Sequence, residues 1–383
     1  MKKINISLLC IQLCLLAMII SSSGLAMPRL AEELGLSSVL QGSVVSIQFL
    51  GFALGALIGG TLADRYGRVR VLRFGFAGVG IATVVFVSSV HYMMAVSGVF
   101  FIGFFGSICQ NAIVSLTTAY DSERADANNA LVNVFFTVGA IITPLLLMLF
   151  MIELNLWRVA YYIISVLCIS MSIYVLKYDE PSGSKSSSIK EAFIQYRVAF
   201  TKPIYLVAPL TLFLYVGAET GLWGFAPMLF EGRGYGKISG IVASVFIWVA
   251  MFLGRALSVK LLKKYDMVKI LLAHGVLTII SLTCVIFSNQ AAAIFWIAIS
   301  GFACAPFYPF LTNWMIRLTG EKTSTMLAFN MAAGGFGPVV MGVFTGMVVD
   351  SFGSKYTTVI PAFVMVLAVM ILFIFRSRKA DNC

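Results

Sequence analysis

Residues 60–70 read Gly-Thr-Leu-Ala-Asp-Arg-Tyr-Gly-Arg-Val-Arg and lie between two long apolar runs. The run before them carries Gly51, Gly55 and Gly59, spaced four residues apart, so three glycines share one helix face. The backbone of another helix can approach such a face closely. Gly67 suits a tight turn that needs a positive φ. We therefore expect a short basic turn joining two membrane helices.

The composition of the whole chain points to a membrane protein. Apolar residues make up 60% of the 383 residues and charged residues only 11%, whereas a soluble chain carries roughly a quarter charged residues. The net charge of +11 lies in short loops between apolar runs, which is the positive-inside pattern and not a nucleic-acid patch. We expect a lipid bilayer as the surroundings and no nucleic-acid partner.

Twelve apolar segments can be counted, each long enough to cross a bilayer as a helix. The first follows Met1-Lys2-Lys3 and is too long for the apolar region of a signal peptide, so it is interpreted as the first membrane helix. The segments lie near 5–27, 38–62, 71–90, 93–118, 129–152, 157–176, 204–230, 238–261, 267–287, 290–317, 324–348 and 356–375.

One linker divides the chain. Between the sixth and seventh segments, residues 181–188 read Pro-Ser-Gly-Ser-Lys-Ser-Ser-Ser, a flexible composition. The sequence therefore predicts an N-terminal six-helix half at 1–176, a cytoplasmic linker at 177–203 and a C-terminal six-helix half at 204–383.

The distribution of Lys and Arg predicts the topology. If both termini are cytoplasmic, most of the 27 basic residues fall in inner segments. The few that fall in outer loops are Arg29, Arg158, Arg233, Lys237 and Lys355. We expect a multi-pass protein of the cytoplasmic (plasma) membrane with both termini inside.

Reactive side chains form no enzymatic pattern. Six of the seven cysteines lie within apolar runs, so we expect packing residues and no disulfides. We find no nucleophile–base set, phosphate-binding loop or metal-ligand spacing, and therefore expect no enzyme, no cofactor and no bound metal. The partners expected are a small-molecule substrate and a proton, and the chain is expected to be a monomer.

Of the sixteen acidic residues, only Glu219 lies midway along an apolar run. Burying a carboxylate there costs about 2.5–3.5 kcal/mol, so such a residue usually faces a cavity or a partner. Tyr215 and Trp223 lie four residues to either side and share its helix face. A sugar could bond the carboxylate and stack on the indole, while protonation of Glu219 could couple transport to protons. The alternative is a protonated Glu219 bonded to a neighbouring helix.

Amide side chains at membrane depth are further candidates for substrate binding. Gln48 lies on the second segment, and Gln110 and Asn111 lie on the fourth. Neutral amides suit an uncharged hydroxylated ligand, although each could instead join two helices. Arg255, near the end of the eighth segment, is expected to pair with another side chain or to snorkel rather than to contact substrate.

The stretch at 60–72 resembles the loop signature of the major facilitator superfamily, Gly-x-Leu-Ala-Asp-Arg-x-Gly-Arg-basic-x-x-Leu, with Val69 in place of the second basic residue. The matching residues are Gly60, Leu62, Ala63, Asp64, Arg65, Gly67, Arg68 and Leu72. The resemblance implies an all-α fold of twelve transmembrane helices in two pseudo-symmetric halves. It also implies a conformational latch made by Gly60, Asp64, Arg65, Gly67 and Arg68. The alternative is a solvated loop whose arginines only fix topology.

Two short segments look like the fucose/glucose–galactose/proton symporter branch of that superfamily. They are Tyr-Val-Gly-Ala-Glu at 215–219 and Ala-Pro-Phe-Tyr-Pro-Phe at 305–310, where prolines break the helix beside the sugar site. The resemblance implies that Tyr308 lies at that site. The chain departs from the fucose symporter in lacking an acid on the first segment and in carrying Gln110 on the fourth. Glu219 would then titrate alone, or transport would be uncoupled.

These residues together favour a secondary active transporter that moves a small neutral polar solute, a sugar, by alternating access with proton coupling. The alternative function is efflux of drugs or amphipathic metabolites, which the many Met and Phe residues favour. A receptor or scaffold that transports nothing is a third interpretation, which the short loops disfavour.

Overall fold

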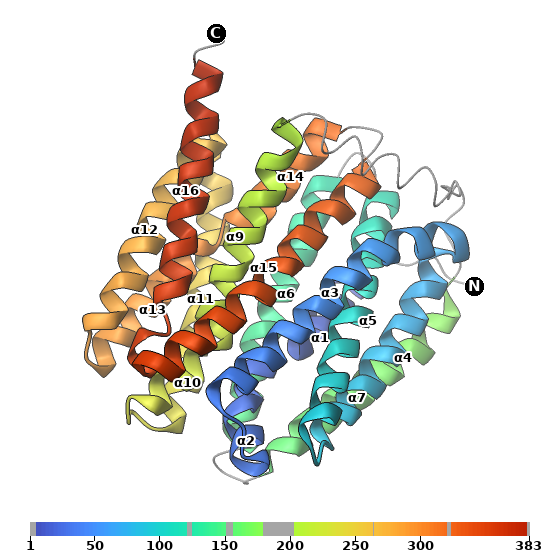
Figure 1. Cartoon of the computed structure of the whole chain (residues 1–383). Coiled ribbons are helices and arrows are strands. Elements are labelled where there is room, and N and C mark those ends of the chain that lie inside the picture. Colours follow the sequence, from blue (N-terminus) through green and yellow to red (C-terminus); the bar gives the residue numbers. More distant parts are fainter. Residues whose placement is uncertain are drawn as a thin grey trace. The chain divides into compact units, whose positions relative to one another are not determined.

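The protein is all-helical. The structure, a computed structural model, describes residues 5–120, 125–150, 156–178, 203–262, 264–319 and 323–380. Within this part of the chain, twelve spans are long and apolar enough to cross a membrane (Figure 1). The prediction of an all-α membrane protein with twelve transmembrane helices is confirmed.

The helices follow the apolar runs of the sequence. They are α1 (Ile6–Ile20), α2 (Ser23–Leu34), α3 (Ser38–Tyr66), α4 (Arg68–Val87), α5 (Tyr92–Tyr120), α6 (Ala125–Met148), α7 (Trp157–Tyr174), η2 (Val175–Lys177), α9 (Ile204–Gly224), α10 (Ala226–Gly232), α11 (Lys237–Leu261), α12 (Met267–Phe287), α13 (Gln290–Cys304), α14 (Phe307–Thr319), α15 (Thr323–Phe352), η4 (Ser354–Tyr356) and α16 (Val359–Ala380).

The contacts divide the chain into two compact units. Unit 1 comprises Met1–Ser23, Ile47–Lys202 and Ile316–Ala332, and unit 2 comprises Gly24–Ser46, Pro203–Met315 and Ala333–Cys383. These units follow spatial contacts, whereas the predicted six-helix halves follow the order of the sequence. The halves at 1–176 and 204–383 therefore stay a prediction.

In unit 1, α4 packs against both α5 and α7, and α1 packs against α6. The glycine face of α3 meets α5: a Cβ built at Gly51 or Gly55 would overlap the carbonyl oxygen of Phe100 or Phe104. A Cβ at Gly59 would lie 3.1 Å from the Cα of Ile108. The expected close approach of a second helix backbone to this face is confirmed.

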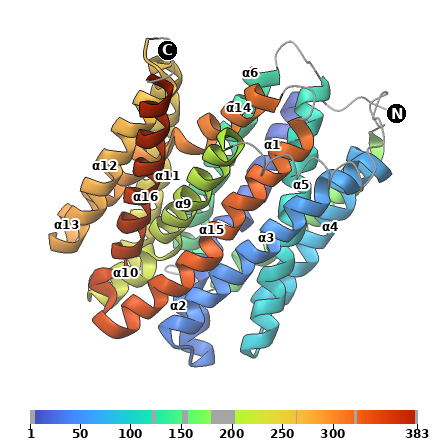
Figure 2. The same ribbon diagram turned by 45° about the horizontal axis from the view of Figure 1, so that its top comes forward.

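In unit 2, α13 packs against α11 and α12, and α16 packs against α9 and α12. Figure 2 shows α12 and α16 running side by side. The unit also contains α2, where a Cβ at Gly24 would overlap the backbone of Gly224. At the start of α3, the Ser46 hydroxyl donates to the Pro338 carbonyl at 3.2 Å. These contacts tie α2 and the start of α3 to helices from the other end of the sequence.

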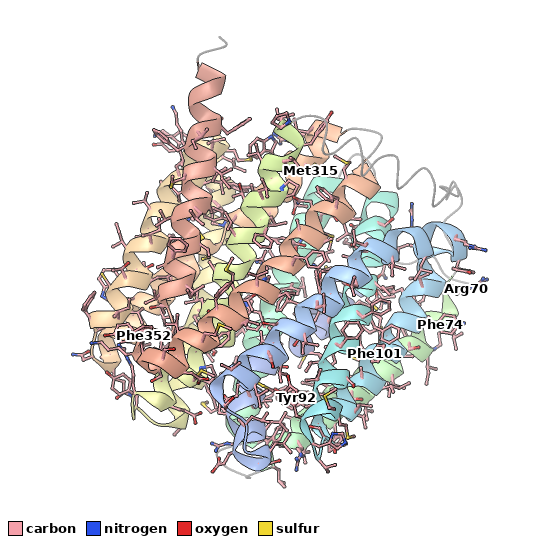
Figure 3. All side chains as sticks on the ribbon, in the orientation of Figure 1. Arg70, Phe74, Tyr92, Phe101, Met315 and Phe352 are labelled. Carbon is pink, nitrogen blue, oxygen red and sulfur yellow. The ribbon has the colours of Figure 1, made fainter. Side chains whose placement is uncertain are left out.

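Large apolar side chains cover much of the surface. Phe74 on α4 is 60% exposed and Phe352 at the end of α15 is 71% exposed, and both are labelled in Figure 3. In water such residues would favour association, whereas in a bilayer they face lipid at no cost. The surface therefore fits a protein embedded in lipid.

Three of the twelve segments expected from the sequence are interrupted in the structure. The expected segment 5–27 is in fact two helices, α1 and α2, and the second continues to Leu34. At the junction, the Ser21 hydroxyl bonds back to the Ala17 carbonyl at 2.6 Å and competes with the helical ladder. The expected segment 204–230 is likewise two helices, because Pro227 lacks an N–H and disfavours helical backbone before it. The third break lies at residues 305–306, between α13 and α14.

Candidate functional site

Glu219 lies within α9, five residues before its end, and is 8% exposed. Its charge interacts with that of Arg255 on α11, which is half-buried. Both residues belong to unit 2. Opposite charges at this depth attract each other, and an isolated charge is costly in an apolar interior.

Tyr215 and Trp223 lie one helical turn to either side of Glu219, as the sequence predicts. The Tyr215 ring is fully buried and stacks on Phe307, with ring centroids 5.0 Å apart and planes 10° apart. The Trp223 indole packs against Trp248 on α11, with centroids 5.9 Å apart. Each ring therefore already has an aromatic neighbour, which fixes its orientation beside Glu219.

The break between α13 and α14 brings further side chains to this cluster. Pro306 has no N–H, so the helix cannot continue its hydrogen-bond ladder through that residue. Tyr308 follows the break in the first turn of α14, and the charges of Glu219 and Arg255 both act on its phenol. The structure thus brings Tyr215, Glu219 and Tyr308 together with Arg255.

One hydroxyl on α9 is buried without a partner among the residues that the structure describes. The Oγ1 atom of Thr220 makes no hydrogen bond there, whereas the Tyr215 phenol interacts with the Glu219 carboxylate. Both residues are at most 2% exposed. An unsatisfied buried polar group costs about 1–3 kcal/mol, so a ligand that supplied the missing bonds would recover this free energy.

Arg255 was not predicted as part of the site. The sequence suggested pairing or snorkelling. In the structure its charge acts on Glu219, and its Nη2 atom lies 3.5 Å from the Met251 sulfur. The available signal was that an acid and a base at membrane depth lie on consecutive long spans. What the sequence could not supply was the contact between α9 and α11 side chains.

The predicted amide residues lie in unit 1. The Gln48 side chain is buried, and its Nε2 donates to the Ile20 carbonyl at 2.9 Å while Oε1 has no partner within the described residues. The Asn111 Nδ2 donates to the Ala56 carbonyl at 3.0 Å and so joins α5 to α3. Gln110 is buried at 6% exposure. Contact of these three amides with a solute stays a prediction.

The turn between α3 and α4 has the expected backbone. Gly67 adopts φ 92°, which only glycine enters without strain. Arg65 is exposed, and Arg68 donates from Nη1 to the Ser115 carbonyl on α5 at 3.5 Å. Gly60 faces open space, and the side chain of Asp64 lies outside the described part of the structure. A latch role for these residues stays a prediction.

No group of three His, Cys, Asp or Glu side chains gathers to ligate a metal within the residues that the structure describes. The six cysteines in that part of the chain are free thiols.

Comparison with known proteins identifies the family. A model of the Major Facilitator Superfamily matches residues 9–297 and 240–382. The chain belongs to the Major Facilitator Superfamily. Its members are transporters, so this chain is a transporter of that superfamily, and the family resemblance seen in the sequence is confirmed.

Solved structures with the same fold are distant in sequence. The superfamily transporter FucP in its outward conformation is 17% identical, with a TM-score of 0.71 over 96% of this chain and 98% of that chain. The nucleoside transporter NupG is 14% identical with a TM-score of 0.79, covering 96% and 99% of the two chains. A bacterial homologue of the human lysosomal transporter Spinster is 16% identical with a TM-score of 0.76, covering 96% and 95%. These likenesses show the fold alone.

One curated relative has higher local identity. A probable chloroplastic anion transporter of Arabidopsis thaliana is 36% identical over 131 residues. The match covers 32% of this chain and spans only a quarter (25%) of the length of that relative. It supports membership of a transporter family and leaves the substrate open.

Proposed function

We propose that this transporter is a secondary active carrier that moves a small neutral polar solute, a sugar, by alternating access of its two six-helix halves. The observation that carries the proposal is the buried Glu219 carboxylate, which lies beside Arg255 and between the aromatic groups of Tyr215 and Trp223. A charge at this depth is costly and is usually functional.

Glu219 is the proposed site of proton coupling. In its ionised form the carboxylate is stabilised by Arg255, and in its protonated form it becomes neutral and can donate a hydrogen bond. Two protonation states with different partners supply what coupling requires, because each state favours a different arrangement of the surrounding helices.

The solute site is proposed at the same cluster. The Glu219 carboxylate and the Thr220 hydroxyl, which has no partner among the described residues, support a ligand that both donates and accepts hydrogen bonds, as a sugar does. Trp223 and Tyr308 would add an aromatic face and a further phenol. In unit 1, substrate binding by Gln48, Gln110 and Asn111 is proposed from the sequence alone.

The membrane and the orientation of the carrier are proposed from the charges of its loops. The positive-inside distribution supports the cytoplasmic membrane with both termini in the cytoplasm. The turn that contains Gly60, Asp64, Arg65, Gly67 and Arg68 is proposed to latch one conformation. The carrier is proposed to act as a monomer.

A transport panel tests this proposal. Purified protein in vesicles with an imposed pH gradient would be offered neutral sugars, polyols, a sugar acid and lipophilic cations. We expect accumulation of at least one neutral sugar that collapses when a protonophore removes the gradient. Accumulation of the sugar acid alone would show that the transported solute is an anion and not a neutral sugar. Sugar uptake that is unchanged by the protonophore would show that transport is not coupled to protons.

Efflux of amphipathic compounds is the second candidate function. The aromatic pairs Tyr215–Phe307 and Trp223–Trp248 favour it, because an apolar cation can bind to such faces. In the panel, gradient-driven extrusion of lipophilic cations without any sugar uptake would establish efflux in place of import.

A further inference from the structure

The break between α13 and α14 is held by a side chain from another helix. Because Pro306 lacks an N–H, the carbonyls near the end of α13 lose helical partners. The Ala305 N–H turns back to the Phe302 carbonyl at 3.3 Å. The Ala303 carbonyl lies 3.0 Å from Nδ1 of His274 on α12. Since a carbonyl only accepts, His274 must carry a proton on Nδ1 and donate it.

Other contacts fix the His274 ring in this position. The side chain is buried, at 7% exposure, and its ring lies nearly parallel to Phe302, with centroids 5.8 Å apart and planes 20° apart. One turn further along α12, the Thr278 hydroxyl lies 3.9 Å from the Cys304 sulfur. Two successive turns of α12 therefore contact the last turn of α13.

The first residues of α14 depend on how α13 ends. Phe307, the first residue of α14, stacks on Tyr215, and Tyr308 lies in the field of Glu219. Gly275, next to His274, lies against both α16 and the Phe307 ring: a Cβ at that position would overlap Val369 and would just contact the Cζ atom of Phe307 at 3.4 Å. A change in the angle of the break would move Phe307 and Tyr308 relative to α9.

We propose that His274 is a positioning residue for the solute site. Its hydrogen bond to Ala303 sets the geometry of the α13–α14 break, and the break in turn places Phe307 and Tyr308 against Tyr215 and Glu219. His274 itself acts from the far side of the break, through Ala303 and Phe302. The proposal rests on the proposed function only in taking this cluster as the place where solute binds.

Two substitutions separate the hydrogen bond from the ring contact. His274→Asn keeps an N–H donor at the same number of bonds from Cα and loses the ring, whereas His274→Phe keeps the ring stack on Phe302 and loses the donor. Thr278→Val is the control for a general loss of α12 packing. Hydrogen exchange over residues 300–312 and affinity for the sugar selected in the transport panel would be measured for each variant.

The proposal predicts that His274→Phe speeds exchange around the break and weakens solute binding about 2- to 12-fold, the equivalent of one net hydrogen bond. His274→Asn should restore both properties to near wild-type values. The proposal is wrong if the Phe variant behaves like wild type, or if the Asn and Phe variants are equally impaired. If the wild type binds none of the solutes, the proposed function fails, while exchange still decides whether His274 holds the break.

Discussion

The contact of α3 with α5 in unit 1 and the contact of α9 with α11 in unit 2 use opposite chemistry. In unit 1, Gly51 and Gly55 let backbones touch, and the Asn111 amide bonds the Ala56 carbonyl across the contact. In unit 2, Glu219 and Arg255 put opposite charges between helices. The comparison shows that the role of a polar residue at membrane depth depends on whether the protein itself already supplies the partners of that residue.

The largest effect is expected from removing the base of the charged pair. Arg255→Gln withdraws the positive charge that acts on Glu219. Without that charge an ionised carboxylate is less favourable at membrane depth, so gradient-driven accumulation should fall roughly tenfold or more while solute exchange without a gradient persists. Paired uptake and exchange assays in vesicles would measure this.

Arg255→Lys is the matched control, because it keeps the positive charge and loses the fork of donors. It should retain more accumulation than the Gln variant. Equal accumulation by wild type and Arg255→Gln would show that the charged contact in unit 2 has no part in coupling.

The next largest effect concerns the glycine face of unit 1. Gly55→Ala forces a methyl group against the Phe104 carbonyl and the Ser107 hydroxyl, and overpacking of this kind costs about 1–3 kcal/mol. Gly60→Ala is the matched control, because a Cβ at that position on the same helix meets open space and should be neutral. Thermal unfolding of both variants in detergent would compare them, and equal melting temperatures would refute the close-packing account.

A smaller pair of effects contrasts a satisfied polar group with an unsatisfied one. Asn111→Ala removes a bond between α5 and α3, and should cost about 0.5–1.5 kcal/mol of stability without changing solute affinity. Thr220→Val removes a buried hydroxyl that has no partner among the described residues, and should weaken solute binding without loss of stability. Melting temperatures and binding isotherms would be measured for both variants. Weaker binding by Asn111→Ala together with lower stability of Thr220→Val would contradict these assignments.

These residues also show which features of the fold and of the site can be predicted from the sequence. The Gly51–Gly55–Gly59 face and the Gly67 turn could be predicted, because helical spacing and backbone freedom are local properties. The pairing of Glu219 with Arg255 could not, since it depends on which helices pack together. Pro306 signalled one helix break, but not that His274 would bond the carbonyl beside it, and the break before Pro227 was not predicted.

The smallest effect tests a charge outside the membrane-spanning segments. Burial raises the pKa of Glu231 on α10, Arg29 acts to lower that pKa, and Glu32 acts to raise it. A carboxyl whose pKa is raised in the folded state favours folding less as pH rises from its unfolded value, about 4.3, through the folded value. The melting temperature of wild type should therefore fall relative to Glu231→Gln across that window. A constant difference between the two proteins would contradict this.

Proton movement driven by solute tests the central claim most directly. Vesicles containing the transporter would receive the transported sugar in weakly buffered medium, and external pH would be recorded for wild type and Glu219→Gln, with Glu231→Gln as the control. The account predicts that the sugar alkalinises the medium with wild type and with the control. It predicts no pH change with Glu219→Gln, although that variant still binds and exchanges the sugar. Alkalinisation by Glu219→Gln at the wild-type rate would contradict the assignment of Glu219 as the coupling group.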